Sequence, residues 1–229
     1  MAVTNVQHRR GSGRLRATIL LWILGLLGGC TSAISPPTQQ AGPPRGSGGL
    51  VVTGRGWSGK TILGPVPAPG SCHLRYAGRQ PLPDPRCTPG AVDSAVTQAN
   101  LRSTACRKGG YTGSVRPPES VTYQIKRRLL AAYGIPVADI GQYELDHLVQ
   151  LSGGGSSDVR NLWPEPNVLY SGAGSSSVHN DKDRVETYLF HAQCAGKASL
   201  SAIQQAISRN WTTAVAVLGL PPIPTGYRG

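Results

Sequence analysis

Residues 143–166 read YELDHLVQLSGGGSSDVRNLWPEP, and this stretch decides the fold that we expect. Tyr143 to Leu151 and Val159 to Trp163 are short runs of β-compatible residues, so both are predicted strands. Residues 153–158, rich in Gly and Ser, predict a long turn between them. A helix is expected from Val178 to Ala192, with Val185, Leu189 and Phe190 on its buried side. The order strand, long loop, strand, helix suits a single ion held between a two-stranded ribbon and one helix.

The same stretch carries side chains that suit hydrolysis. Asp146 and His147 are adjacent, Asn161 lies in the second predicted strand, and a polar run of residues 179–183 opens the helix. Cutting a phosphodiester with one divalent metal needs a general base for water and an ion for the phosphate charge. Each residue also has a structural interpretation, namely a strand-end ion pair, a turn residue or a helix N-cap. Their combination in this order favours catalysis.

Further helices are expected around this unit. The apolar spacing predicts helices over residues 91–105 and 120–133, and Ser199 is a suitable N-cap for a last helix that runs to Trp211. Residues 57–120 are expected to form a disulfide-containing leader with one helix, and the tail of residues 213–229 is expected to be irregular. Trp163 and Trp211 are predicted core residues.

The N-terminus has the order of an export signal. Residues 1–29 contain a basic start, a short apolar run and small residues before Cys30, and the apolar run is too short to span a bilayer. This pattern resembles a bacterial lipobox, in which Cys30 is lipidated; a plain signal peptide that contains a cysteine is the alternative. Residues 30–56, rich in Pro, Gly and Ser, are expected to form a flexible tether. The chain is therefore predicted to be exported and held at the cell envelope by a lipid anchor.

The cysteines agree with export. Without Cys30 four remain, and an even number outside the cytosol predicts two disulfides. We favour Cys72–Cys87 with Cys106–Cys194, because the first pair closes a short proline-rich loop; the sequence alone allows three pairings.

The chain is strongly basic. Its formal net charge is +12, and without the four arginines of the signal 19 basic and 11 acidic side chains remain, or +8. Such a charge attracts nucleic acid or an anionic envelope surface, and the net charge alone does not distinguish these two partners.

Residues 54–61, GRGWSGKT, match the P-loop pattern. A P-loop must open a helix whose N-terminal amides hold phosphate, but Pro65, Pro67 and Pro69 follow too closely for that helix. We therefore expect no nucleotide cofactor.

Together these motifs resemble a known family. The segments ELDHL with two glycines, NLWPEP and KDRVE, preceded by DPRCTPGA and VRPP, look like an exported bacterial branch of the HNH nucleases, also called His-Me finger or ββα-metal nucleases. The resemblance covers residues 81–211. It implies an α+β protein with a small ββα-metal core and additional flanking helices, stabilised by disulfides. That core is expected within residues 121–212.

The resemblance also implies the roles of the site residues. His147 matches the general base, Asp146 a metal ligand, and Asn161 the residue that holds the backbone around the base. Adjacent residues of a strand face opposite ways, so Asp146 and His147 require a strand end or a bulge. The helix supplies the remaining metal ligand: His179 is preferred, Asn180 is close behind, and Asp183 is a further candidate. Lys182 and Arg184 are candidate phosphate-binding residues.

One divalent ion is expected, and Mg²⁺, Mn²⁺, Zn²⁺ and Ni²⁺ all suit oxygen and imidazole ligands. The leading hypothesis is thus a metal-dependent endonuclease acting on DNA or RNA. The alternative is a non-enzymatic envelope lipoprotein that uses the same scaffold for binding or structure.

Overall fold

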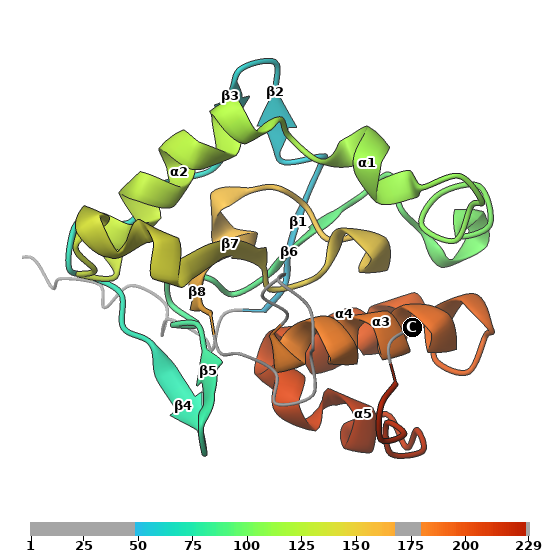
Figure 1. Ribbon diagram of the computed structural model, residues 1–229. Coiled ribbons are helices and arrows are strands. Elements are labelled where there is room, and N and C mark those ends of the chain that lie inside the picture. The colour runs from blue at the N-terminus through green and yellow to red at the C-terminus, as the bar shows by residue number, and fades with distance from the viewer. Residues whose placement is uncertain (1–48, 168–179, 228–229) are drawn as a thin grey trace, which may run out of the picture. The chain divides into compact units, whose positions relative to one another are not determined.

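The computed structural model describes residues 49–167 and 180–227. The chain divides into residues 1–41 and 42–229, and every described residue belongs to the second unit. This unit is a mixed α/β structure with small sheets and two disulfides (Figure 1). The signal segment, Cys30 and most of the expected tether lie outside the described residues.

The strands form four two-stranded sheets in the described part of the chain. One is parallel, β1 (Val51–Thr53) with β6 (Ala91–Asp93). The other three are antiparallel: β2 (Trp57–Ser58) with β3 (Thr61–Ile62), β4 (Arg75–Ala77) with β5 (Gln80–Leu82), and β7 (Tyr143–His147) with β8 (Leu162–Pro166).

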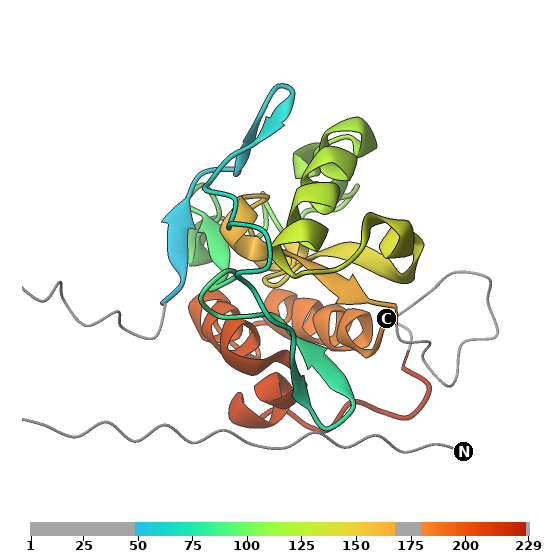
Figure 2. The same ribbon diagram turned by 90° about the vertical axis from the view of Figure 1, so that its left-hand side faces the viewer.

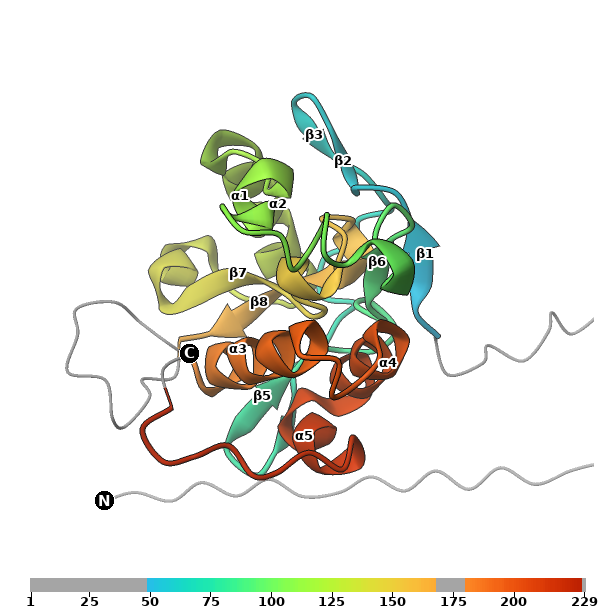
Figure 3. The same ribbon diagram turned by 90° about the vertical axis from the view of Figure 1, so that its right-hand side faces the viewer.

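Five α-helices accompany these sheets among the described residues. They are α1 (Tyr111–Val115), α2 (Glu119–Ala132), α3 (Asp181–Cys194), α4 (Leu200–Asn210) and α5 (Ala214–Val217). Figures 1 and 3 show the β7–β8 pair between α2 on one side and α3 on the other. The chain thus passes through two paired strands and then a helix, in the order predicted. In the described residues no helix is both long and apolar enough to cross a membrane.

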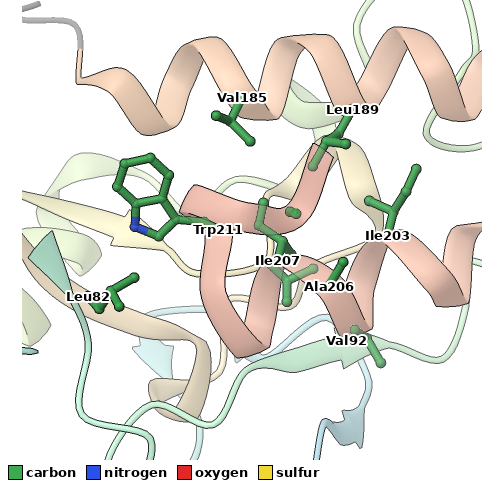
Figure 4. Packing of buried hydrophobic residues seen from close by; sticks show 10 residues of the cluster. Leu82, Val92, Val185, Leu189, Ile203, Ala206, Ile207 and Trp211 are labelled. Atoms are coloured by element: carbon green, nitrogen blue, oxygen red, sulfur yellow. The ribbon is translucent and has the colours of Figure 1, made fainter. Parts of the chain in front are cut away.

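The largest apolar cluster joins the C-terminal helices to the sheets. Val185 and Leu189 of α3 face Ile203 and Ile207 of α4 (Figure 4). Trp211 closes this cluster and donates from its indole Nε1 to the carbonyl oxygen of Pro81 at 2.9 Å. Trp163 is fully buried in a second cluster with the Cys72–Cys87 disulfide. The prediction that both tryptophans are core residues is confirmed.

The disulfide pairing is also confirmed. Cys72 bonds to Cys87 and Cys106 bonds to Cys194, across sequence separations of 15 and 88 residues. Such bonds are typical of an oxidising, exported compartment.

Two predictions for the leader are wrong. Residues 91–105 do not form a helix, because Ala91–Asp93 pairs in parallel with β1, and only the short 3₁₀ turn Gln98–Asn100 follows. The tether cannot extend to residue 56, since β1 is part of a sheet and Gly56 is buried. A Cβ atom at Gly56 would lie 2.1 Å from the backbone nitrogen of Asp158, so only glycine allows this contact.

The P-loop-like residues lie in the hairpin that projects at the top of Figure 2. β2 and β3 pair across Gly59 and Lys60, and Gly59 has a φ of 56°. A strand therefore follows the turn at the position where a P-loop requires a helix.

The remaining boundaries differ for local reasons. β7 ends at His147, and residues 159–161 form a 3₁₀ turn before β8. Pro164 and Pro166 belong to β8. They are two residues apart, so their backbone nitrogens lie on the same edge of the strand, the edge that faces away from β7, and no hydrogen bond to β7 is lost there. The tail expected to be irregular begins with the helix α5.

Candidate functional site

His147 is the last residue of β7, so the strand end required beside Asp146 is present. Its side chain is only 6% exposed, and its Nε2 lies 3.0 Å from the hydroxyl oxygen of Ser157 in the loop between the strands. The pKa of His147 is lowered to about 3, mainly by burial; the charge of Asp146 opposes this shift, and the charges of Arg116 and Lys182 add to it. The imidazole is therefore neutral at neutral pH.

Asn161 fixes the loop around His147. Its Nδ2 donates to the carbonyl oxygens of Val149 and Ser156 at 2.9 and 2.8 Å. Its Oδ1 accepts from the backbone nitrogens of Val149 and Ala91 at 2.9 and 3.2 Å. The fully buried amide thus uses both ends on backbone groups, which is the positioning role expected for it.

Asp146 points to α3 rather than toward His147. Its Oδ2 accepts from the indole Nε1 of Trp163 at 2.6 Å and lies 2.7 Å from the Nζ of Lys182. The two residues expected to share a catalytic centre therefore have different partners.

Lys182 is not a surface phosphate ligand, so this prediction is wrong. Its side chain is 1% exposed, and its Nζ donates to the carbonyl oxygen of His147 at 3.0 Å. The same ammonium contacts the carboxylate of Glu186, one helical turn along α3. Lys182 therefore ties the first turns of α3 to the end of β7.

Buried carboxyl groups surround this lysine. Burial raises the pKa of Glu186 to about 8 and raises the pKa of Glu165 well above its usual range, and the charge of Asp146 adds to both effects. Glu144 is affected in the same way, with a pKa raised to about 7 by burial and by Asp146. Lys182 itself has a raised pKa: burial opposes its charge, but Asp146 and Glu186 outweigh that cost. Lys182 thus forms salt bridges with both Asp146 and Glu186 in this cluster.

The start of α3 is occupied by a helix cap. The Asn180 side chain accepts from the Asp183 backbone, and Asp183 Oδ2 accepts from the Asn180 backbone nitrogen at 3.0 Å. The Nδ2 of Asn180 donates to Glu144. Asn180 and Asp183 therefore form a capping box. His179, the preferred helix ligand, lies outside the described residues.

Arg184 also has intramolecular partners. Its Nη2 donates to the carbonyl oxygens of Ile223 and Pro224 in the C-terminal tail, at 3.3 and 2.9 Å. The tail contacts α3 again where the Tyr188 hydroxyl donates to the Pro221 carbonyl oxygen at 2.9 Å. The predicted phosphate-binding arginine thus holds the tail against α3.

The described residues do not fit the expected divalent ion. The ammonium group of Lys182 already contacts Asp146. The Asn180 amide accepts from the Asp183 backbone in the helix cap and donates to Glu144. Within residues 49–167 and 180–227, no three His, Cys, Asp or Glu side chains are arranged to hold an ion.

Three residues of this site were not predicted from the sequence. Ser157 is buried against His147, Glu186 contacts Lys182, and the exposed Arg116 acts on the pKa of His147. Glu186 was detectable, because it follows Lys182 by four residues and so lies on the same helical face. Ser157 and Arg116 reach His147 only through tertiary structure. Arg116 belongs to the VRPP segment, but nothing in that segment relates it to the histidine.

Comparisons with known proteins give no relative: no family model, no curated protein and no solved structure matches this chain.

Proposed function

We propose that this protein is an exported hydrolase of phosphodiester bonds, with an HNH-type core made of β7, β8 and α3. The observation that carries the proposal is the neutral imidazole of His147 at the end of β7, fixed by Ser157 and by the loop that Asn161 holds. A general base must be unprotonated before it takes a proton.

In the proposed reaction, a water oxygen attacks phosphorus while its proton passes to the imidazole of His147. The bond between phosphorus and the leaving oxygen breaks, and that oxygen takes a proton from solvent. Burial keeps the pKa of the free imidazole low, but an anionic phosphodiester beside it raises that pKa toward the neutral range. Substrate binding therefore makes His147 a stronger base.

Positive charge supports an anionic substrate. The sequence without its signal carries +8, and the exposed Arg116 is close enough to His147 to affect its pKa. A guanidinium group binds phosphate oxygens in a bidentate manner. Arg116 is therefore the phosphate-binding candidate, in place of Lys182 and Arg184. The substrate is DNA or RNA, and a lipid on Cys30 would keep the enzyme at the cell envelope.

The test is cleavage of supercoiled plasmid and of single-stranded RNA by the purified chain, in EDTA and with Mg²⁺, Mn²⁺ or Zn²⁺. His147→Ala should abolish cleavage, while His73→Ala, at an exposed histidine, should leave it unchanged. Circular dichroism must show that both variants fold. Equal cleavage by wild type and His147→Ala, or none by wild type in any condition, would contradict the proposal.

One observation favours a second candidate, a non-enzymatic envelope protein that binds nucleic acid. The Asp146 carboxylate is engaged by Lys182 and Trp163, as in a purely structural ion pair. Retention of labelled DNA by wild type without cleavage would favour this function.

A further inference from the structure

We infer that the ammonium group of Lys182 joins β7 to α3 in the position where the expected divalent ion would lie. The unit made of β7, β8 and α3 therefore folds without a bound metal ion. The inference does not depend on whether the protein cleaves phosphodiesters.

The first support is the set of groups around the Nζ of Lys182. It contacts Asp146 Oδ2 at 2.7 Å, the carbonyl oxygen of His147 at 3.0 Å, and the carboxylate of Glu186. Two carboxylates and a carbonyl are oxygen ligands of the kind that also bind hard divalent cations. Here they come from β7 and α3, the two elements that such an ion would join, and three oxygen acceptors match the three N–H donors of the ammonium group.

The second support is that this cation cannot move aside easily. Lys182 lies in the first turn of α3, between the two capping-box residues Asn180 and Asp183, and its side chain is almost fully buried. A divalent ion at Asp146 would force the ammonium away from its partners or require it to lose a proton. The contacts with Asp146, Glu186 and the carbonyl oxygen of His147 oppose both changes, because removal of the ammonium group would leave these acceptors without their partner.

The experiment compares the thermal unfolding midpoint of the full chain in EDTA and in excess Mn²⁺, with Mn²⁺ binding followed by electron paramagnetic resonance. The wild-type midpoint should be the same in both conditions, and any weak Mn²⁺ binding should be equal in Asp146→Asn. Lys182→Met, which retains length and loses charge, should lower the midpoint clearly. Lys197→Met, at an exposed lysine, is the matched control and should not.

Coupling between the partners gives a second readout. The double variant Asp146→Asn with Lys182→Met should lose less stability than the sum of the two single losses, because each single change leaves an unpaired buried group. A wild-type midpoint raised by Mn²⁺, with the increase absent in Asp146→Asn, would overturn the inference. So would an unchanged midpoint in Lys182→Met. If Lys182→Met does not fold, the comparison of wild type with Asp146→Asn still decides the matter.

Discussion

At the scale of single residues, the site is determined more by buried polar groups than by exposed catalytic ones. The resemblance predicted that Asn161 holds the backbone near His147, and its buried amide bonds to backbone groups with both of its ends. Lys182 was predicted to be a phosphate-binding residue accessible to the substrate, because a charged residue at the start of a helix is ordinarily solvated. Lys182 is buried because the packing of α3 against β7 brings its ammonium group to the carboxylate of Asp146.

Replacing Asn161 by Ala should destabilise the protein severely. The change leaves two backbone N–H groups and two carbonyls without their buried partner, and we expect a loss of about 3 kcal/mol or more in the free energy of unfolding. Urea unfolding measures this loss. Asn167→Ala is the control, because the Asn167 side chain donates to the Gly141 carbonyl oxygen at an exposed position. Equal effects of the two changes would show that the Asn161 contacts contribute little.

Asp84 should make stability fall in acid. Burial alone would raise its pKa, but hydrogen bonds from Arg86 and from the backbone of His73 lower it to about 2, from 3.8. Between these values an unfolded chain binds a proton that the folded chain does not, so stability decreases as pH falls from about 3.8 to about 2.

The variant Asp84→Asn isolates this effect. It should be less stable than wild type at neutral pH, and the difference should shrink as the pH falls to about 2. Free energies of unfolding across this range measure it, with Asp139→Asn as the control. A difference that does not vary with pH would show that the Asp84 carboxylate does not stabilise the fold.

At the scale of elements, local signals predicted the helices better than the strands. α4 begins at Leu200, directly after its predicted cap Ser199. α2 begins at Glu119, and its N-cap is Pro118, which makes no side-chain hydrogen bond, so the apolar spacing located this helix and a cap did not. The helix expected over residues 91–105 was wrong, since β6 forms by pairing with β1, some forty residues earlier. The apolar residues of such a short segment do not reveal a partner so distant in sequence.

The cap of α4 offers a test at this scale. The Ser199 side chain accepts from the backbone nitrogen of Ala202 at 3.3 Å, so Ser199→Ala should lower the free energy of unfolding by about 1 kcal/mol. Ser201→Ala, at an exposed position inside the helix, should be neutral or slightly stabilising because alanine favours helices. Denaturant unfolding of both variants checks this, and a Ser199→Ala variant as stable as wild type would exclude a contribution from the cap.

At the scale of the whole molecule, the two disulfides connect segments that small sheets alone hold weakly. Their pairing followed from the number of cysteines and the short Cys72–Cys87 loop, whereas the packing of α3 and α4 against the leader could not be read from the sequence. The tail differs from its prediction for a similar reason, since its contacts with α3 are tertiary.

The two disulfides should contribute unequally to stability. Loop-closure entropy predicts about 3 kcal/mol for a separation of 15 residues and about 4.6 kcal/mol for one of 88. Replacing Cys106 and Cys194 by Ala should therefore lower the free energy of unfolding more than replacing Cys72 and Cys87. Guanidinium unfolding of the two double variants checks the order, and the reverse order would show that local packing outweighs chain entropy.

We propose that Lys182, and not a divalent ion, joins β7 to α3. An anomalous difference map from crystals of the full chain soaked in Mn²⁺ tests this proposal. We expect no anomalous peak at Asp146 and the Lys182 ammonium group still in contact with that carboxylate. A peak within bonding distance of Asp146, with the lysine displaced, would contradict it.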